Sequence, residues 1–124
     1  MRRNCGVIVE DNNRKLLICN SRFCELFGIP ISPEKMIGED CSKSAEFVKH
    51  LFKNPDKFVK DIDKILLEKK PIIDEKIYMK DGNILIRDYL PIFAGEKYMG
   101  HTWQYHIYES RIDKTINFLK NIFK

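Results

Sequence analysis

Residues 72–108, IIDEKIYMKDGNILIRDYLPIFAGEKYMGHTWQYHIY, decide the fold of this chain of 124 residues. Apolar residues recur at about every second position of this stretch, which is the spacing of β-strands. The turn sequences KDGN at 80–83 and AGE at 94–96 divide it into three runs. The stretch therefore predicts a three-stranded antiparallel meander with strands at 72–79, 84–93 and 97–108.

The segment before the meander has a helical period. Phe58, Ile62, Ile65 and Leu66 share one face of a helix, while lysines and acidic residues fill the other face. Pro55 can occupy the first turn of this helix, and Pro71 cannot continue it. We expect one amphipathic helix between these two prolines.

The N-terminal part of the chain predicts two further strands and several short helices. Runs at 5–10 and 15–19 are joined by the turn residues DNN, so they form a hairpin. Asn20 can cap a short helix that Gly28 ends, a proline-initiated turn follows Ser32, and residues 44–52 suggest another short helix. This order predicts an α+β fold, a five-stranded antiparallel sheet with helices packed on one face.

Composition and motifs exclude several functional classes. The chain is 44% hydrophobic and 32% charged with a net charge of +4, and its lysines are interspersed with acids. We therefore expect no nucleic-acid partner. No apolar run approaches the roughly 20 residues of a membrane span, and no signal peptide follows the N-terminus, so we expect no membrane association and a cytoplasmic location. No catalytic motif is present, so we expect no enzymatic activity and no catalytic residue.

The four cysteines have spacings that do not favour metal binding. Cys5, Cys19, Cys24 and Cys41 include no C-x-x-C pair, so we expect no metal site. In a reducing compartment they act as small apolar side chains. A hairpin that brought Cys5 close to Cys19 would allow this pair to oxidise.

Several motifs together resemble the PAS family of sensory domains. They are GVIVEDNNRKLLICNSRFCELFGIP at 6–30, MIGEDCS at 36–42, MKDGNILIRDYLPIF at 79–93 and GEKYMGHTWQYHIYESR at 95–111. The last strand lacks the Asp-Ile-Thr that commonly follows it in the family. The resemblance implies a sensory domain at 1–109 and a connector helix at 110–124 that leads to an output domain, such as that of a histidine kinase in a two-component system. A shared fold does not by itself transmit a function.

The resemblance also implies a pocket between the inner sheet face and the helices. Its candidate lining residues are Phe27, Cys41, Phe58, Ile62, Ile77, Arg87, Tyr89, Trp103 and Tyr105. Flavin is not favoured: light-sensing members carry Gly-x-Asn-Cys-Arg-Phe-Leu-Gln, and here only Gly38 and Cys41 match, with Gln104 as a further candidate. Haem is not favoured either, because residues 55–70 lack the histidine that ligates iron in oxygen-sensing members. The cofactor is left unknown.

One strand of the meander carries a charge on each face. Leu85, Arg87, Tyr89 and Phe93 alternate with Ile84, Ile86, Asp88, Leu90 and Ile92. The resemblance to the PAS family, through the match of the strand ends, implies that the Arg87 face is the inward one. An inward guanidinium needs a partner, which is either an internal acid such as Asp40 or the carboxylate or phosphate of a ligand. The mostly apolar outer face indicates a cover, either the terminal helix or a second copy of the chain.

The terminal helix carries Ile112, Ile116, Leu119 and Phe123 at heptad-like spacing. These residues either pack back on the sheet or pair in a homodimer and relay a signal. Our leading hypothesis is a ligand-responsive sensor, in which a small molecule changes the balance between two states of the final strand and terminal helix. The alternative is a ligand-free dimerisation or docking module.

Overall fold

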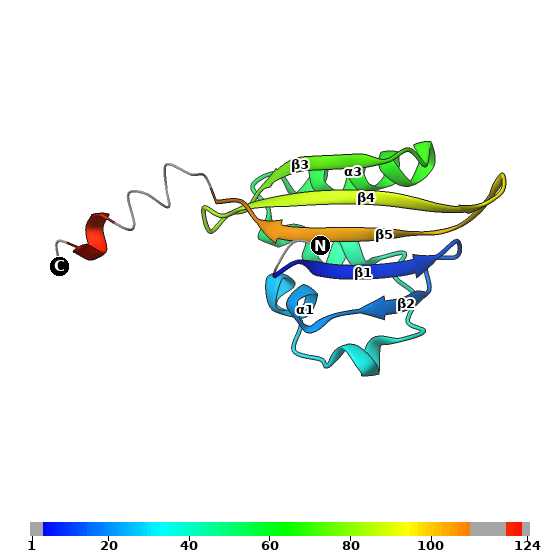
Figure 1. Ribbon diagram of the computed structural model, residues 1–124, viewed down its shortest axis with the longest axis horizontal. Helices are drawn as coiled ribbons and strands as arrows, with labels where there is room; N and C mark the ends of the chain where they lie inside the picture. Colours follow the sequence, from blue (N-terminus) through cyan, green and yellow to red (C-terminus); the bar gives the residue numbers. More distant parts are fainter. Residues whose placement is uncertain (1–3, 110–118, 123–124) are drawn as a thin grey trace.

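The computed structural model describes residues 4–109 and 119–122. Five strands and three α-helices account for most of the first range, with two short 3₁₀ turns among the helices (Figure 1). In chain order the elements are β1 (Gly6–Asp11), β2 (Leu16–Cys19), α1 (Ser21–Phe27), η1 (Pro33–Met36), α2 (Ser44–Val48), η2 (Lys49–Leu51), α3 (Pro55–Glu68), β3 (Ile72–Tyr78), β4 (Ile84–Ala94) and β5 (Lys97–Ile107).

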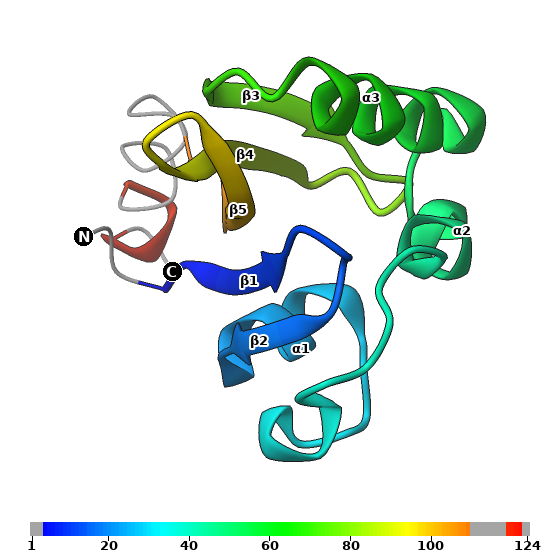
Figure 2. The same ribbon diagram turned by 90° about the vertical axis from the view of Figure 1, so that its right-hand side faces the viewer.

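The strands form one sheet in the order β2-β1-β5-β4-β3, and every neighbouring pair is antiparallel. The N-terminal hairpin joins the meander through β1 and β5, with Gly6 opposite Tyr105 and Asp11 opposite Gly100. In Figure 2 the helices α1, α2 and α3 lie on one side of this sheet. The predicted fold class is confirmed.

The core lies between the inner sheet face and the helices, where buried aromatic residues dominate. Phe52 and Phe58 stack with ring centroids 3.9 Å apart, and Phe27 meets the edge of Tyr105 at 4.9 Å. Offset and edge-to-face contacts of this kind favour a fixed arrangement of the rings. The helical layer is therefore held to the sheet by aromatic packing.

Asn20 ties the start of α1 to the sheet with three hydrogen bonds. Its Oδ1 accepts from the backbone N–H groups of Phe23 and Val7, both at 3.0 Å, and its Nδ2 donates to the Cys5 carbonyl at 2.9 Å. By contrast, Asn54 caps α3 through one bond, from the Lys57 N–H. Asn20 thus acts both as a helix cap and as a link between two elements.

Replacing Asn20 by alanine should lower the free energy of unfolding by about 2 kcal/mol, because two N–H groups and one carbonyl lose their partner. Asn54→Ala is the matched control, and it should cost about 1 kcal/mol because one capping bond is lost. Urea denaturation of both variants measures the difference. Equal losses would show that the bonds from Asn20 to β1 and Cys5 contribute nothing.

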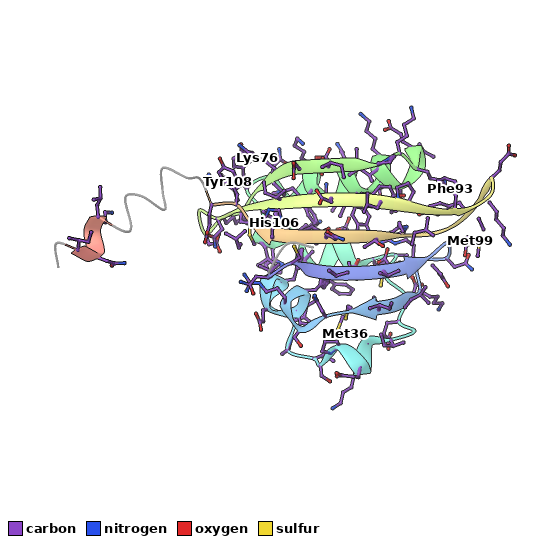
Figure 3. All side chains as sticks on the ribbon, viewed as in Figure 1. Met36, Lys76, Phe93, Met99, His106 and Tyr108 are labelled. Carbon is purple, nitrogen blue, oxygen red and sulfur yellow. The ribbon has the colours of Figure 1, made fainter. Side chains whose placement is uncertain are left out.

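Two local departures from the expected elements have clear physical causes. The helix expected at 44–52 tightens after Val48 into the 3₁₀ turn η2, and Phe47 is 77% exposed. The β4–β5 ladder is irregular between Ile92 and Phe93, where the extra residue Met99 is on β5; Phe93 therefore keeps its predicted inward face, opposite Tyr98, although 48% of its surface is exposed. Figure 3 shows Phe93 near Met99 at the outer end of the β4–β5 hairpin.

The terminal segment is described only at 119–122, which are helical. Leu119 and Ile122 are 47% and 55% exposed, so neither is packed in the core. Ile112, Ile116 and Phe123, the other proposed relay residues, lie outside the described residues. Within 4–109 and 119–122, no helix has the length and apolar character needed to cross a membrane.

Candidate functional site

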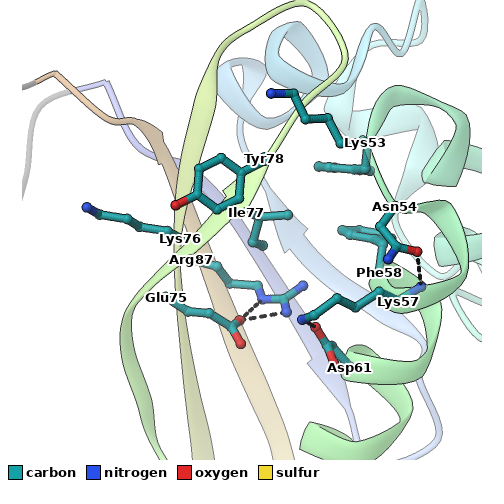
Figure 4. Close-up of a pocket in the computed structure, with 11 residues that line it drawn as sticks. Lys53, Asn54, Lys57, Phe58, Asp61, Glu75, Lys76, Ile77, Tyr78 and Arg87 are labelled. Atoms are coloured by element: carbon teal, nitrogen blue, oxygen red, sulfur yellow. Dashed lines mark hydrogen bonds and ion pairs between the residues drawn. The ribbon is translucent and has the colours of Figure 1, made fainter.

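A cavity of about 350 Å³ lies between the first half of α3 and strands β3 and β4 (Figure 4). This volume is within the range of small-molecule sites in proteins. Because β3 is an edge strand, the cavity has a route to solvent between this strand and α3. Its lining residues are Phe52, Lys53, Asn54, Lys57, Phe58, Asp61, Glu75, Lys76, Ile77, Tyr78 and Arg87.

Arg87 is the most buried charged residue of the cavity wall, with 1% of its surface exposed. Its Nε and Nη2 donate to Glu75 Oε1 at 2.8 and 2.6 Å. The guanidinium lies 5.7 Å from the centroid of the Phe58 ring and 5.5 Å from that of Trp103, so two aromatic faces hold it from opposite elements. The side chain is fixed in one position by these contacts.

The third nitrogen of this guanidinium, Nη1, has no such hydrogen bond to a described residue. It is buried, and among residues 4–109 and 119–122 no group accepts a hydrogen bond from it. A buried donor without a partner costs about 1–3 kcal/mol. Tyr105 lies beside the guanidinium, and burial raises the pKa of its hydroxyl although Arg87 opposes that effect. The cavity wall therefore contains one donor that none of the described residues satisfies.

The partner of Arg87 is an internal acid, but not the one that was suggested as an example. Asp40 forms an isolated backbone β-bridge with Lys15, and its side chain accepts from the Ser42 N–H instead. Glu75 takes that role because it is the residue opposite Arg87 in the β3–β4 pair. The inward orientation of Arg87 and its internal ion pair agree with the expectation from the sequence.

The nine candidate pocket residues separate into two groups. Phe58, Ile77 and Arg87 line the cavity. The other six are packed in the hydrophobic core and do not line it: Phe27, Cys41, Ile62, Tyr89, Trp103 and Tyr105. Sequence reasoning missed the other eight lining residues: Phe52, Lys53, Asn54, Lys57, Asp61, Glu75, Lys76 and Tyr78.

A second group of buried polar residues surrounds Glu10, which is 2% exposed. Its Oε1 accepts from His101 Nε2 at 2.5 Å, from Arg14 Nε at 2.9 Å and from Trp103 Nε1 at 3.2 Å. Because a carboxylate only accepts, Nε2 of His101 carries a proton, and Nδ1 is then able to accept from the Tyr98 hydroxyl that it contacts. Burial raises the pKa of Glu10, but the His101 hydrogen bond and the charge of Arg14 outweigh it, so the net pKa is lowered.

Solved structures with the same arrangement of elements identify the fold. The PAS domain from Bordetella pertussis BvgS is 15% identical with a TM-score of 0.64, and the match covers 96% of this chain and 89% of that one. A domain of an HTR-like protein from Haloarcula marismortui is 11% identical with a TM-score of 0.55, and the match covers 86% of this chain and 99% of that one. The chain has the PAS fold.

A third PAS-like match extends over part of a longer protein. The sensor region of a sensor histidine kinase is 11% identical with a TM-score of 0.62, and the match covers 82% of this chain and 38% of that one. No protein-family model matches the chain, and no curated protein sequence matches it. At these identities the structural likeness establishes the PAS fold and nothing more specific.

The cofactor positions of the PAS resemblance can now be located. Cys41 is 7% exposed and belongs to the core rather than to the cavity lining, and burial followed by the charge of Glu10 raises the pKa of its thiol to about 12. Gln104 lies between the inward residues Trp103 and Tyr105 on β5, so it is on the outer face and cannot reach the helical side of the sheet. In the part of the chain that the structure describes, no cluster of three or more metal-ligating side chains occurs, and all four cysteines are free thiols.

Proposed function

We propose that the chain is a sensory PAS module, the input domain of a histidine kinase or a related signalling protein, that binds a small ligand and passes the signal to an output domain. The observation that carries this proposal is the cavity of about 350 Å³, which opens beside a buried arginine with an unused donor. A module that served only as a docking surface would need no such cavity. The module itself performs no chemistry.

A route from the cavity to the end of the domain is available in the sheet. Arg87 lies opposite Tyr105 of β5, so the cavity wall is one strand away from the strand that leaves the domain. At the end of β5, the Tyr108 N–H donates to the Ile84 carbonyl at 2.7 Å, and Lys76 of β3 places its Nζ 4.5 Å from the Tyr108 ring centroid. Figure 3 shows Lys76 and Tyr108 at the same end of the sheet. Displacement of β3 by a ligand would therefore change the contacts of Tyr108.

The size of the relayed effect has a physical limit. A ligand shifts the balance between two states only by its differential affinity for them. We propose that the two states differ in how the final strand continues into residues 110–124. The connector would pair with its equivalent in a homodimer of the full-length protein, in the cytoplasm.

Ligand binding can be tested by thermal denaturation and native mass spectrometry of the purified chain with a panel of neutral, acidic and basic small molecules. A true ligand at ten times its Kd adds about 1.4 kcal/mol of stability. For a domain of this size the Tm should rise by roughly 5 °C. The nuclear magnetic resonance signal of the Tyr108 amide should shift with the same saturation curve.

Two tryptophan variants separate binding in the cavity from binding elsewhere. Ile77→Trp fills the cavity and should abolish both the Tm rise and the Tyr108 shift. Ile73→Trp changes an exposed residue of the same strand and should preserve both effects. A ligand response that survives Ile77→Trp, or the absence of any stabilising compound, would refute the sensor proposal.

A ligand-free dimerisation or docking module is the second candidate, and one observation favours it. The outer sheet face exposes Leu90 and Ile92 of β4 by 37% and 43%, and Ile18 of β2 by 59%. Apolar patches of this kind often mark protein interfaces. If this candidate is correct, the Tm depends on protein concentration and responds to no small molecule.

A further inference from the structure

We infer that the ligand of this cavity is a small organic acid whose carboxylate binds the outer edge of the Arg87 guanidinium. The inference rests on the proposed function and adds the chemical class of the ligand. Its basis is the combination of a ligand-sized cavity, a buried donor without a partner and apolar walls on either side of that donor.

The guanidinium of Arg87 offers two edges for bidentate contacts, and the protein uses one of them. Nε and Nη2 form one edge, and both donate to the same oxygen of Glu75. Nη1 and the second N–H of Nη2 form the other edge, which the described residues leave without an acceptor at Nη1. In Figure 4 the nitrogen without a dashed line points away from Glu75 toward Phe58 and Lys57. A carboxylate is the group whose two oxygens match this edge.

The walls of the cavity indicate what the rest of the ligand is like. Phe58, whose ring stacks on that of Phe52, lies on one side, and Ile77 of β3 lies on the other side (Figure 4). This arrangement fits a flat or compact apolar group attached to the carboxylate. The cavity is too small and too enclosed by these side chains for a nucleic acid or a protein segment.

Charge in the lining of the cavity favours an anion. The lining includes four basic residues and two acidic residues, but Lys76 extends away from the cavity to the Tyr108 ring, so the remaining groups carry a formal excess of +1. The acids are both engaged, since Asp61 receives Lys57 Nζ at 2.6 Å and Glu75 holds Arg87. The lining as a whole therefore attracts an anion, and this attraction weakens with added salt.

Glu75 acts as an internal competitor for the ligand. Its side chain is 30% exposed whereas that of Arg87 is 1% exposed, so the ion pair extends from the cavity wall to the mouth. A negative ligand placed near Nη1 lies close to the Glu75 carboxylate and is repelled by it. Removing the charge of Glu75 should consequently strengthen the binding of acids and leave neutral compounds unaffected.

The decisive experiment compares phenylacetate with phenylacetamide, which has nearly the same shape and no charge. Titrations followed by nuclear magnetic resonance should give a Kd of about 1 mM for phenylacetate, a reasonable value for a compound of this size. The Arg87 Nε–H and the methyl groups of Ile77 should shift on binding. Phenylacetamide should bind at least tenfold more weakly. Inorganic phosphate serves as a third probe, and it should bind more weakly than phenylacetate because it lacks the apolar group.

Three variants assign the preference to the guanidinium. Arg87→Gln should remove the difference between the acid and the amide, and Glu75→Gln should increase the affinity for phenylacetate severalfold without changing that for phenylacetamide. Lys60→Gln is the matched control, because it changes one charge on α3 outside the cavity lining and should leave both affinities within twofold. Glu75→Gln keeps the test valid if Arg87→Gln does not fold.

The outcomes separate this inference from the proposed function. Equal binding of acid and amide, with shifts at Ile77, would refute the carboxylate site while preserving a ligand-binding cavity. Tighter binding of phosphate than of phenylacetate would also refute it. Failure of every compound, neutral or charged, to perturb the cavity residues would overturn both proposals.

Discussion

Replacing Gly100 by alanine is expected to destabilise the domain by about 4 kcal/mol or more, and the variant is expected to be largely unfolded at 37 °C. Gly100 has a φ of +148°, a value that side chains rarely adopt, and it lies opposite Asp11 at the end of the β1–β5 ladder. A Cβ atom built there would be 2.2 Å from the Glu10 carbonyl oxygen and 2.9 Å from the Asp11 Cα. Both are backbone atoms, so no rotation of a side chain can relieve the overlap.

Gly95→Ala is the control for this prediction. Gly95 also has a positive φ, +63°, but nothing lies within 4 Å of the position where its Cβ would be. Its replacement should cost only about 1 kcal/mol, the price of alanine in a left-handed conformation. Circular dichroism during urea denaturation measures both variants. If the Gly100→Ala protein were as stable as Gly95→Ala, β1 and β5 could separate at this end without a loss of stability, which would contradict the prediction.

The elements themselves were predictable because their signals are local. The turn sequence KDGN sets the register of β3 against β4, with Tyr78 opposite Ile84. Counting back from that turn places Glu75 opposite Arg87, so the correct partner of the arginine could have been found from the sequence. The choice of Asp40 was wrong because it was taken from a distant segment while the register already identified a neighbouring acid.

Other parts of the site depend on information that no local pattern carries. The irregularity of the β4–β5 ladder places the extra residue Met99 on β5, and nothing in the periodicity of β4, which carries Phe93 inward with Leu85 and Tyr89, reveals this bulge. From the sequence, Glu10 is a polar residue at the end of a predicted strand. Only the pairing of β1 with β5 shows that its side chain faces His101 and Trp103. The register between strands 90 residues apart is set by packing of the whole core, which periodicity does not describe. The cavity has the same origin, since it is what the packed side chains leave unfilled.

Glu10→Ala is expected to lower the free energy of unfolding by about 3–5 kcal/mol, because it leaves buried donors of His101, Arg14 and Trp103 without an acceptor. Glu10→Gln keeps the shape and one carbonyl oxygen, so it should cost less, about 1–3 kcal/mol. Glu96→Gln removes an exposed carboxylate in the β4–β5 turn and should change stability by under about 0.5 kcal/mol. Urea denaturation at pH 7 provides all three values.

The same carboxylate should make stability depend on pH in a defined direction. The pKa of Glu10 is lowered in the folded protein, so the unfolded chain binds a proton at this site more readily than the folded one. The stabilisation by Glu10 is therefore present above its unfolded pKa and is lost as the pH falls through its folded pKa. Between pH 6 and pH 3 the wild-type protein should lose more stability than Glu10→Gln, while Glu96→Gln should follow the wild type. Parallel curves for the wild type and Glu10→Gln would show that the pKa of this carboxyl group is not lowered by folding. A wild type that gained stability relative to Glu10→Gln as the pH falls would show that Glu10 is protonated in the folded state, and the hydrogen-bond directions assigned to His101 and Tyr98 would then have to be reversed.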